Sequence, residues 1–202
     1  MPEPIEIKPP QRRRKPQEAP RYLTEGEVDA LLKAIKSPRD RAIFQVVYHR
    51  GLRSSEPGKL NLSDYRPAEG RLYVHRVKGS ISAEFRLTDI ENTALRAWLR
   101  IRGLVPGPLF CSRNHRAISA NRLDQLMKLY CRAAGIPEEK AHMHALKLSC
   151  GTHLAELLGG DVTAVQDHLG HADIRSTMKY LQFRGREKNA EKLRDWGRKK
   201  AA

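Results

Sequence analysis

Cysteine is scarce in this sequence, and its three cysteines, Cys111, Cys131 and Cys150, lie far apart. An odd number at such spacing fits neither a disulfide framework nor a Cys-x-x-Cys metal site, so we expect reduced thiols. Long apolar runs are also absent. No stretch approaches the roughly 18 residues of a membrane span, and the N-terminus has no apolar signal segment. These absences predict a soluble, cytoplasmic protein with no membrane partner.

Acidic residues are too few to balance the basic ones. Among 202 residues, 23 Asp and Glu face 38 Lys and Arg, which gives a net charge of +15. A surplus of this size indicates a polyanionic partner, most often nucleic acid; a merely solvated basic surface is the alternative. Aromatic residues make up only 6%, which gives little support for a surface that stacks single-stranded bases.

The chain divides into three segments. Residues 1–20 are rich in proline and carry the basic run Arg12, Arg13, Arg14 and Lys15, which predicts a flexible arm or linker able to contact DNA. Residues 21–183 form the folded domain, since 40% of the chain is hydrophobic and can supply one core. Residues 184–202 are again basic and predict a solvated tail or helix.

Helical patterns dominate the folded segment. Capping residues followed by apolar residues at helical spacing predict helices after Thr24, Ser37, Thr88 and Ser119, and further helices over 144–158, 161–169 and 174–181. In the helix after Thr88 we expect one buried face, made of Ile90, Ala94, Leu95, Trp98 and Leu99.

Two short segments have the pattern of strands instead. Residues 71–77 and 83–87 are rich in β-branched and aromatic residues, and Lys78-Gly79-Ser80 between them suits a turn. We therefore expect a hairpin with Lys78 near its tip. The sequence predicts an α+β fold that is mostly helical, with one small antiparallel sheet.

Several polar motifs lie in the second half of the chain. They are His144-Ala-Leu-Lys147, then Leu169-Gly170-His171, then Tyr180 nine residues later. Taken alone, a histidine on a helix is usually an ordinary surface or core residue, and a tyrosine near a helix end usually packs. The motifs therefore have to be judged together.

Together with Gly51-Leu52-Arg53-Ser54-Ser55-Glu56 and Lys78, these motifs resemble the tyrosine recombinases, also called phage integrases. The resemblance runs from about Thr24 to about Phe183, with the motifs in the family's order and spacing. It implies that family's catalytic-domain fold over 21–183. It also implies site-specific DNA strand exchange through a 3′-phosphotyrosyl intermediate and a Holliday junction, with no metal and no cofactor.

The residue types suit this chemistry. Breaking a phosphodiester with a side chain requires a nucleophile, a proton donor for the leaving oxygen, and cations around the non-bridging oxygens. The phenol of Tyr180 can attack phosphorus and conserve the bond for rejoining. The guanidinium of Arg53 can hold two phosphate oxygens, and Lys78 is a candidate proton donor to the leaving 5′ oxygen.

The resemblance assigns the remaining site residues and shows one departure. It implies that His144 helps in proton transfer, that His171 donates to a phosphate oxygen, and that Glu56 steadies the pocket from behind. The family's second arginine falls at Lys147, which keeps the charge but loses the planar fork. Losing one charge-assisted hydrogen bond costs roughly 1.5–3 kcal/mol, or about tenfold to a few hundredfold in rate.

Other interpretations remain open. Lys147 fits either a slow recombinase or a recombinase-derived accessory protein that binds DNA and cuts poorly. A type IB topoisomerase would share the pocket, whereas a general basic nucleic-acid binder leaves the motif order unexplained. A metal site built from His142, His144, His153, His168 and His171 lacks ligand spacing of a familiar kind.

The resemblance also implies partners. We expect double-stranded DNA with a specific recombination site, a homotetramer on paired sites, and a monomer or weak oligomer when free. The tail residues Leu193 and Trp196 are candidates for contact with a neighbouring protomer. Since only about 20 residues precede Thr24, we expect either a fragment without the family's core-binding domain or a reduced form. The family is chiefly bacterial, archaeal and phage-encoded, which suggests association with the nucleoid.

Overall fold

The computed structural model describes residues 22–181 except residues 78 and 113. The predicted basic arm (Arg12, Arg13, Arg14 and Lys15), the hairpin residue Lys78, and the tail residues Leu193 and Trp196 lie outside the described residues.

Seven α-helices and three short strands make up the described part of the chain. In chain order the elements are α1 (Glu25–Ala34), α2 (Pro38–Arg50), β1 (Tyr65–Arg66), β2 (Arg71–Val74), β3 (Ala83–Arg86), α3 (Asp89–Arg102), α4 (Ala120–Ala133), α5 (Met143–Leu157), α6 (Val162–Leu169) and α7 (Arg175–Leu181). Single 3-10 turns occur at Pro57–Lys59, Leu62–Asp64 and Glu138–Lys140. The predicted α+β class, mostly helical with a small antiparallel sheet, is confirmed.

The helices begin where the sequence indicates. Thr24 and Thr88 each close a capping box with the glutamate three residues later, and Ser37 and Ser119 accept hydrogen bonds from the first turns of α2 and α4. Each such bond satisfies a backbone N–H that the helix itself leaves unpaired. These caps fix where the helices start and therefore which faces they bury.

The sheet is antiparallel with strand order β1-β2-β3. Leu72 pairs with Tyr65 on one side and with Phe85 on the other. The predicted strand over 71–77 is shorter in the structure and ends at Val74. Beyond it the Arg76 guanidinium turns into the protein and donates to the carbonyls of Gly51 and Arg50. Strand β1 was not predicted, since two residues are too short to show an alternation.

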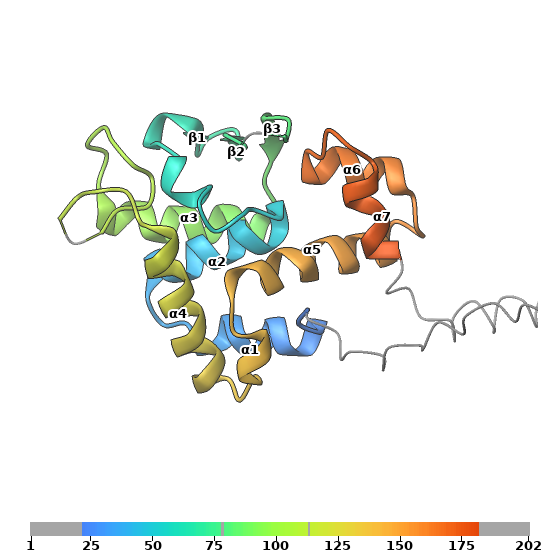
Figure 1. Ribbon diagram of the computed structural model, residues 1–202. Coiled ribbons are helices and arrows are strands. Elements are labelled where there is room, and N and C mark those ends of the chain that lie inside the picture. Colours follow the sequence, from blue (N-terminus) through green and yellow to red (C-terminus); the bar gives the residue numbers. More distant parts are fainter. Residues whose placement is uncertain (1–21, 78, 113, 182–202) are drawn as a thin grey trace, which may run out of the picture.

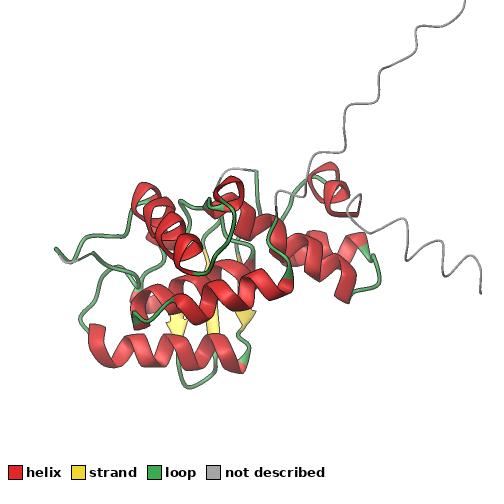
Figure 2. Ribbon diagram, turned by 90° about the horizontal axis from the view of Figure 1, so that it is seen from below, coloured by secondary structure: helices red, strands yellow, loops and turns green. Residues whose placement is uncertain are grey.

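The helices form one body around α2 and α5. Helix α2 packs against α3 and α5, while α6 and α7 cover the far end of α5. In Figure 1 the strands lie at the top, near α2 and α3, and α6 and α7 form the right-hand end. Seen from below in Figure 2, the strands lie behind helices. The loop after β2 thereby comes close to the end of α6, where the Ile81 N–H donates to the Gly170 carbonyl at 2.8 Å.

The buried apolar residues form two clusters. The larger one joins α1 to α5 and the sheet. The smaller one lies between α5, α6 and α7 and consists of Cys150, Ala155, Val165, Leu169 and Tyr180. The predicted catalytic tyrosine is thus also a core residue of this end of the molecule.

The prediction that Ile90 is buried is wrong. Ile90 is 59% exposed, whereas Ala94, Leu95 and Trp98 are buried as expected. The neighbouring Glu91 is fully buried instead, because its carboxylate receives the guanidinium of Arg50 from α2, with the Arg50 Nε 2.8 Å from Oε1. On this part of α3, the buried side chain is therefore a glutamate in an ion pair, whereas the hydrophobic spacing predicted an isoleucine.

Within the described ranges, no helix combines the length and the hydropathy that crossing a lipid bilayer requires.

Candidate active site

A cavity of about 320 Å³ lies where the corner after α2, the start of α5 and the α6–α7 connection meet. It is lined by Arg53, Ser54, Ser55, His144, Lys147, His171, Ser176 and Lys179. Four of the predicted site residues, Arg53, His144, Lys147 and His171, therefore come together from segments that are far apart in the sequence. The sequence did not single out Ser176 or Lys179, which α7 contributes.

A sharp corner after α2 presents Arg53 to the cavity. Gly51 ends α2 in the left-handed conformation with φ of 56°, and a Cβ there would lie only 2.4 Å from Cδ2 of Leu169. Glycine is thus favoured by the turn, and any larger residue would also displace the Leu169 side chain. The Arg53 guanidinium then donates to Glu56 Oε1 at 3.2 Å and to Ser80 Oγ at 2.8 Å.

Glu56 lies behind Arg53 and is fully buried. Its carboxylate accepts hydrogen bonds from the Arg53 N–H at 2.8 Å, the Arg76 guanidinium at 3.2 Å and the Val77 N–H at 3.2 Å. Burial alone would raise the pKa of Glu56, but the backbone bond from Arg53, the charge of Arg76 and the bond from Val77 outweigh it, so its pKa lies below the ordinary value. The carboxylate is charged and joins the α2 corner to the loop after β2.

Arg76 does not line the cavity but supports it from behind, and the sequence motifs did not single it out. Its guanidinium is buried and donates to the carbonyls of Gly51 at 3.2 Å and Arg50 at 2.7 Å, as well as to Glu56. The sequence did contain a signal. By strand alternation Arg76 shares a face with Leu72 and Val74, so a cation is placed on the buried side.

Lys147 reaches the cavity from α5 but is held by the backbone. It is 3% exposed, and its Nζ donates to the Gly51 carbonyl at 2.7 Å. Burial, together with the nearby charge of Arg76, lowers the pKa of Lys147 to about 8. The ammonium is therefore a single, directed charge that is close to losing its proton.

The two histidines of the cavity are neutral near pH 7. Burial, and then the charge of Lys147, lowers the pKa of His171 to about 4. Burial, and then the charge of Lys179, lowers the pKa of His144 as well. Nδ1 of His171 shares a hydrogen bond with Thr177 Oγ1 at 3.0 Å, which fixes the imidazole against α7.

Tyr180 lies beside this cavity but does not line it. The side chain is fully buried, and its hydroxyl has no hydrogen-bond partner among the described residues. Its ring lies nearly parallel to that of His171, at 10° and 6.1 Å between centroids, and it packs directly on Gly151 of α5. Burial raises the pKa of Tyr180 above its ordinary value. The phenol has to turn out of the apolar cluster to reach anything bound in the cavity.

The histidines considered as metal ligands have separate roles. His153 Nδ1 lies 2.8 Å from the Tyr48 hydroxyl, and His168 Nε2 lies 2.7 Å from the His49 carbonyl oxygen. Among residues 22–181 apart from 78 and 113, no three His, Cys, Asp or Glu side chains are grouped to hold a metal ion.

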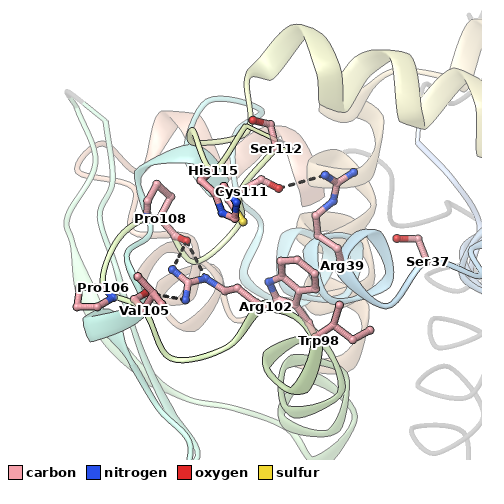
Figure 3. Close-up of a pocket in the computed structure, with 11 residues that line it drawn as sticks. Ser37, Arg39, Trp98, Arg102, Val105, Pro106, Pro108, Cys111, Ser112 and His115 are labelled. Carbon is pink, nitrogen blue, oxygen red and sulfur yellow. Dashed lines mark hydrogen bonds between the residues drawn. The ribbon is translucent and has the colours of Figure 1, made fainter.

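A second and larger cavity, of about 680 Å³, lies at the other end of α3 and contains no predicted site residue. Figure 3 shows Arg102 bonded to the Pro108 carbonyl on one side of it, with Trp98 and Arg39 nearby. The cation-rich cavity beside Tyr180 is the one that matches the predicted chemistry.

The chain is similar to proteins of a known family. A family model described as the phage integrase family matches residues 21–186. The type 1 fimbriae regulatory protein FimB of Escherichia coli K12 is 33% identical over 167 residues, which cover 79% of this chain and 82% of FimB. Tyrosine recombinase XerC of Alcanivorax borkumensis is 34% identical over 175 residues, which cover 81% of this chain and 56% of XerC.

The chain also resembles solved structures in fold. XerH site-specific recombinase, in a pre-cleavage complex with its difH substrate, superposes with a TM-score of 0.70 at 26% identity. The match covers 82% of this chain and 51% of the XerH chain. The chain thus spans most of FimB but about half the length of XerC and XerH.

The packing of Tyr180 on Gly151 generates a prediction. In Gly151→Ala the new Cβ would lie 2.4 Å from Tyr180 Cε1 and 2.6 Å from Cδ1, so the ring has to leave its place. We expect a loss of about 1–3 kcal/mol in unfolding free energy and faster nitration of Tyr180 by tetranitromethane, read by peptide mapping.

The matched control is Gly26→Ala in α1, where nothing lies within 4 Å of the added Cβ. It should leave the nitration of Tyr180 unchanged. Equal nitration rates in Gly151→Ala and the wild type would show that the ring does not depend on this glycine.

Proposed function

The chain belongs to the phage integrase family, and from that membership we propose that it is a site-specific DNA recombinase. It cuts one DNA strand at a time, stores the cut end as a 3′-phosphotyrosyl bond, and rejoins it to a partner strand through a Holliday junction. The observation that carries the proposal is the single cavity that gathers Arg53, His144, Lys147 and His171 next to Tyr180.

In the proposed reaction the scissile phosphate occupies this cavity. The Tyr180 oxygen attacks phosphorus and forms the new P–O bond, while the bond to the 5′ oxygen breaks. Because its pKa is lowered, His144 is neutral and able to take the phenol proton. Lys78, outside the described residues, is the proposed donor to the leaving 5′ oxygen. Religation follows the same path in reverse and needs no water and no cofactor.

The cations and their support have separate roles. The Arg53 guanidinium holds the non-bridging oxygens and stabilises their charge as the transition state forms. Glu56 touches Arg53 and orients it from behind. In the proposed reaction His171, whose Nδ1 is bonded to Thr177 Oγ1, donates to a phosphate oxygen from Nε2. Double-stranded DNA is the proposed partner, as in the XerH complex, which was solved bound to its difH substrate.

One observation favours a second candidate function. Lys147 stands where the family's second arginine is expected, and its ammonium is already bonded to the Gly51 carbonyl. A chain with this pocket could bind DNA at its site and cut poorly, which is the accessory-protein alternative.

Covalent trapping tests the proposed function. We expect nicked suicide DNA carrying the recombination site to give, without added metal, a denaturation-resistant protein–DNA band that Tyr180→Phe abolishes. Tyr180→Phe removes only a hydroxyl that lacks a partner among the described residues, so folding and DNA binding should persist. Tight, salt-sensitive binding without a band would identify the accessory alternative instead.

The lowered pKa of Lys147 generates a pH prediction. The charged groups around it are Arg76, Glu56 and Arg53, and its own pKa of about 8 means that it loses its charge as pH rises through that value. Arginine stays charged. The ratio of single-turnover cleavage by Lys147→Arg to that by the wild type should therefore increase up to about tenfold between pH 7 and pH 9.

At pH 7, Lys147→Arg should already cleave about tenfold to a few hundredfold faster, with nearly unchanged DNA affinity. Taking the ratio cancels the titration of groups common to both proteins. A ratio that stays flat with pH would contradict the assignment of this titration to Lys147.

We also propose that four chains assemble on two paired DNA sites, and that the free chain is a monomer or weak oligomer. In this assembly Leu193 and Trp196, outside the described residues, contact a neighbouring protomer. Sedimentation of the complex should give four chains per pair of sites, and a chain ending at residue 186 should give fewer. An unchanged stoichiometry would exclude the tail from assembly.

A further inference from the structure

The cavity contains a basic residue to which neither the motifs nor the resemblance assigns a role. Lys179 lies on α7, immediately before Tyr180, and lines the cavity opposite the α2 corner that carries Arg53. Burial, and then the charge of Arg53, lowers the pKa of Lys179. Its ammonium and the Arg53 guanidinium are thus near enough to repel each other.

The Lys179 ammonium has little to hold it. Its Nζ lies 5.1 Å from the centroid of the Tyr180 ring, a contact that a cation makes with the face of an aromatic ring. In the described ranges no hydrogen bond and no ion pair fixes this nitrogen. The three donors of the ammonium are therefore available to a ligand in the cavity.

Lys147 differs in each respect. Its Nζ is bonded to the Gly51 carbonyl at 2.7 Å, and the side chain is 3% exposed. That carbonyl takes one of its three donors and fixes the direction of the others. The cavity thus has one lysine tied to the backbone and one lysine free to reach into it.

We propose that Lys179 is a phosphate-contacting residue of the active site, and that its ammonium binds a non-bridging oxygen of the scissile phosphate. It supplies there the charge that Lys147, tied to Gly51, supplies weakly. The inference rests on the proposed function and extends it to one further residue. Because Lys179 and Tyr180 are consecutive on α7, a phosphate held by Lys179 is also brought to the helix that carries the nucleophile.

The test compares Lys179→Met, which removes the charge, with Lys179→Arg, which keeps it. On suicide DNA, Lys179→Met should cleave at least about tenfold more slowly than the wild type, and Lys179→Arg should recover most of the rate. The matched control is Lys33→Met, a lysine exposed on α1 outside the cavity. It should cleave like the wild type. A Lys179→Met rate within twofold of the wild type would overturn the proposal.

A neutral substrate separates a phosphate contact from a structural role. With a methylphosphonate at the scissile position there is no negative charge to neutralise, so Lys179→Met and wild type should cleave at similar rates. An equal penalty on both substrates would mean that Lys179 only supports the fold. In the Lys179→Met background, Lys147→Arg should accelerate cleavage by a larger factor than in the wild type. The same acceleration in both backgrounds would contradict the idea that Lys179 compensates for the weak contact of Lys147.

Binding measurements keep this proposal distinguishable from the proposed function. In Tyr180→Phe, which cannot cut, duplexes selected from a random pool are compared with the same duplexes carrying one methylphosphonate at each central position. At one position the substitution should weaken binding, and adding Lys179→Met should abolish that difference. A wild type that forms no covalent band would contradict the recombinase proposal alone. If the methylphosphonate still weakens binding in the presence of Lys179→Met, only the proposed phosphate contact of Lys179 is contradicted.

Discussion

The buried carboxylate of Glu56 is the interaction on which the site depends. A charge fully removed from water is stable only when several donors surround it, and here the Arg53 and Val77 N–H groups and two guanidinium groups do so. Through Arg76 the network continues to the Gly51 carbonyl, which also receives Lys147. One buried anion and one carbonyl thus set the relative positions of the α2 corner, the loop after β2 and helix α5.

The sequence predicted what local rules control. Capping boxes at Thr24 and Thr88, and glycine after α2, are read from neighbouring residues. Motif spacing also indicated Arg53, His144, Lys147 and His171, which the cavity brings together. Other features depend on contacts between distant segments. Ile90 is exposed because Arg50, 40 positions earlier, draws Glu91 inward, and Arg76 and Lys179 acquire their surroundings only when the loop after β2 and α7 reach the cavity.

The balance of charge in the cavity links binding to stability. Its histidines have pKa values below the ordinary range and are neutral near pH 7, so its charge comes from Arg53, Lys147 and Lys179. Glu56 is engaged behind them. Like charges held together in a partly buried space cost folding free energy, and a phosphate diester placed among them relieves that cost. Burial and, after it, repulsion by nearby guanidinium groups lower the pKa of each lysine, and an anionic ligand would offset both effects.

The burial of Tyr180 in an apolar cluster has a consequence for which DNA the proposed reaction cuts. Moving a buried aromatic ring into a polar cavity costs roughly 1.5–3 kcal/mol, so the reactive arrangement is populated about tenfold to a hundredfold less than it would otherwise be. In the proposed reaction, binding at the recombination site has to supply that free energy. In that reaction, packing that stabilises the end of a small domain would also set a threshold against cleavage of weakly bound DNA.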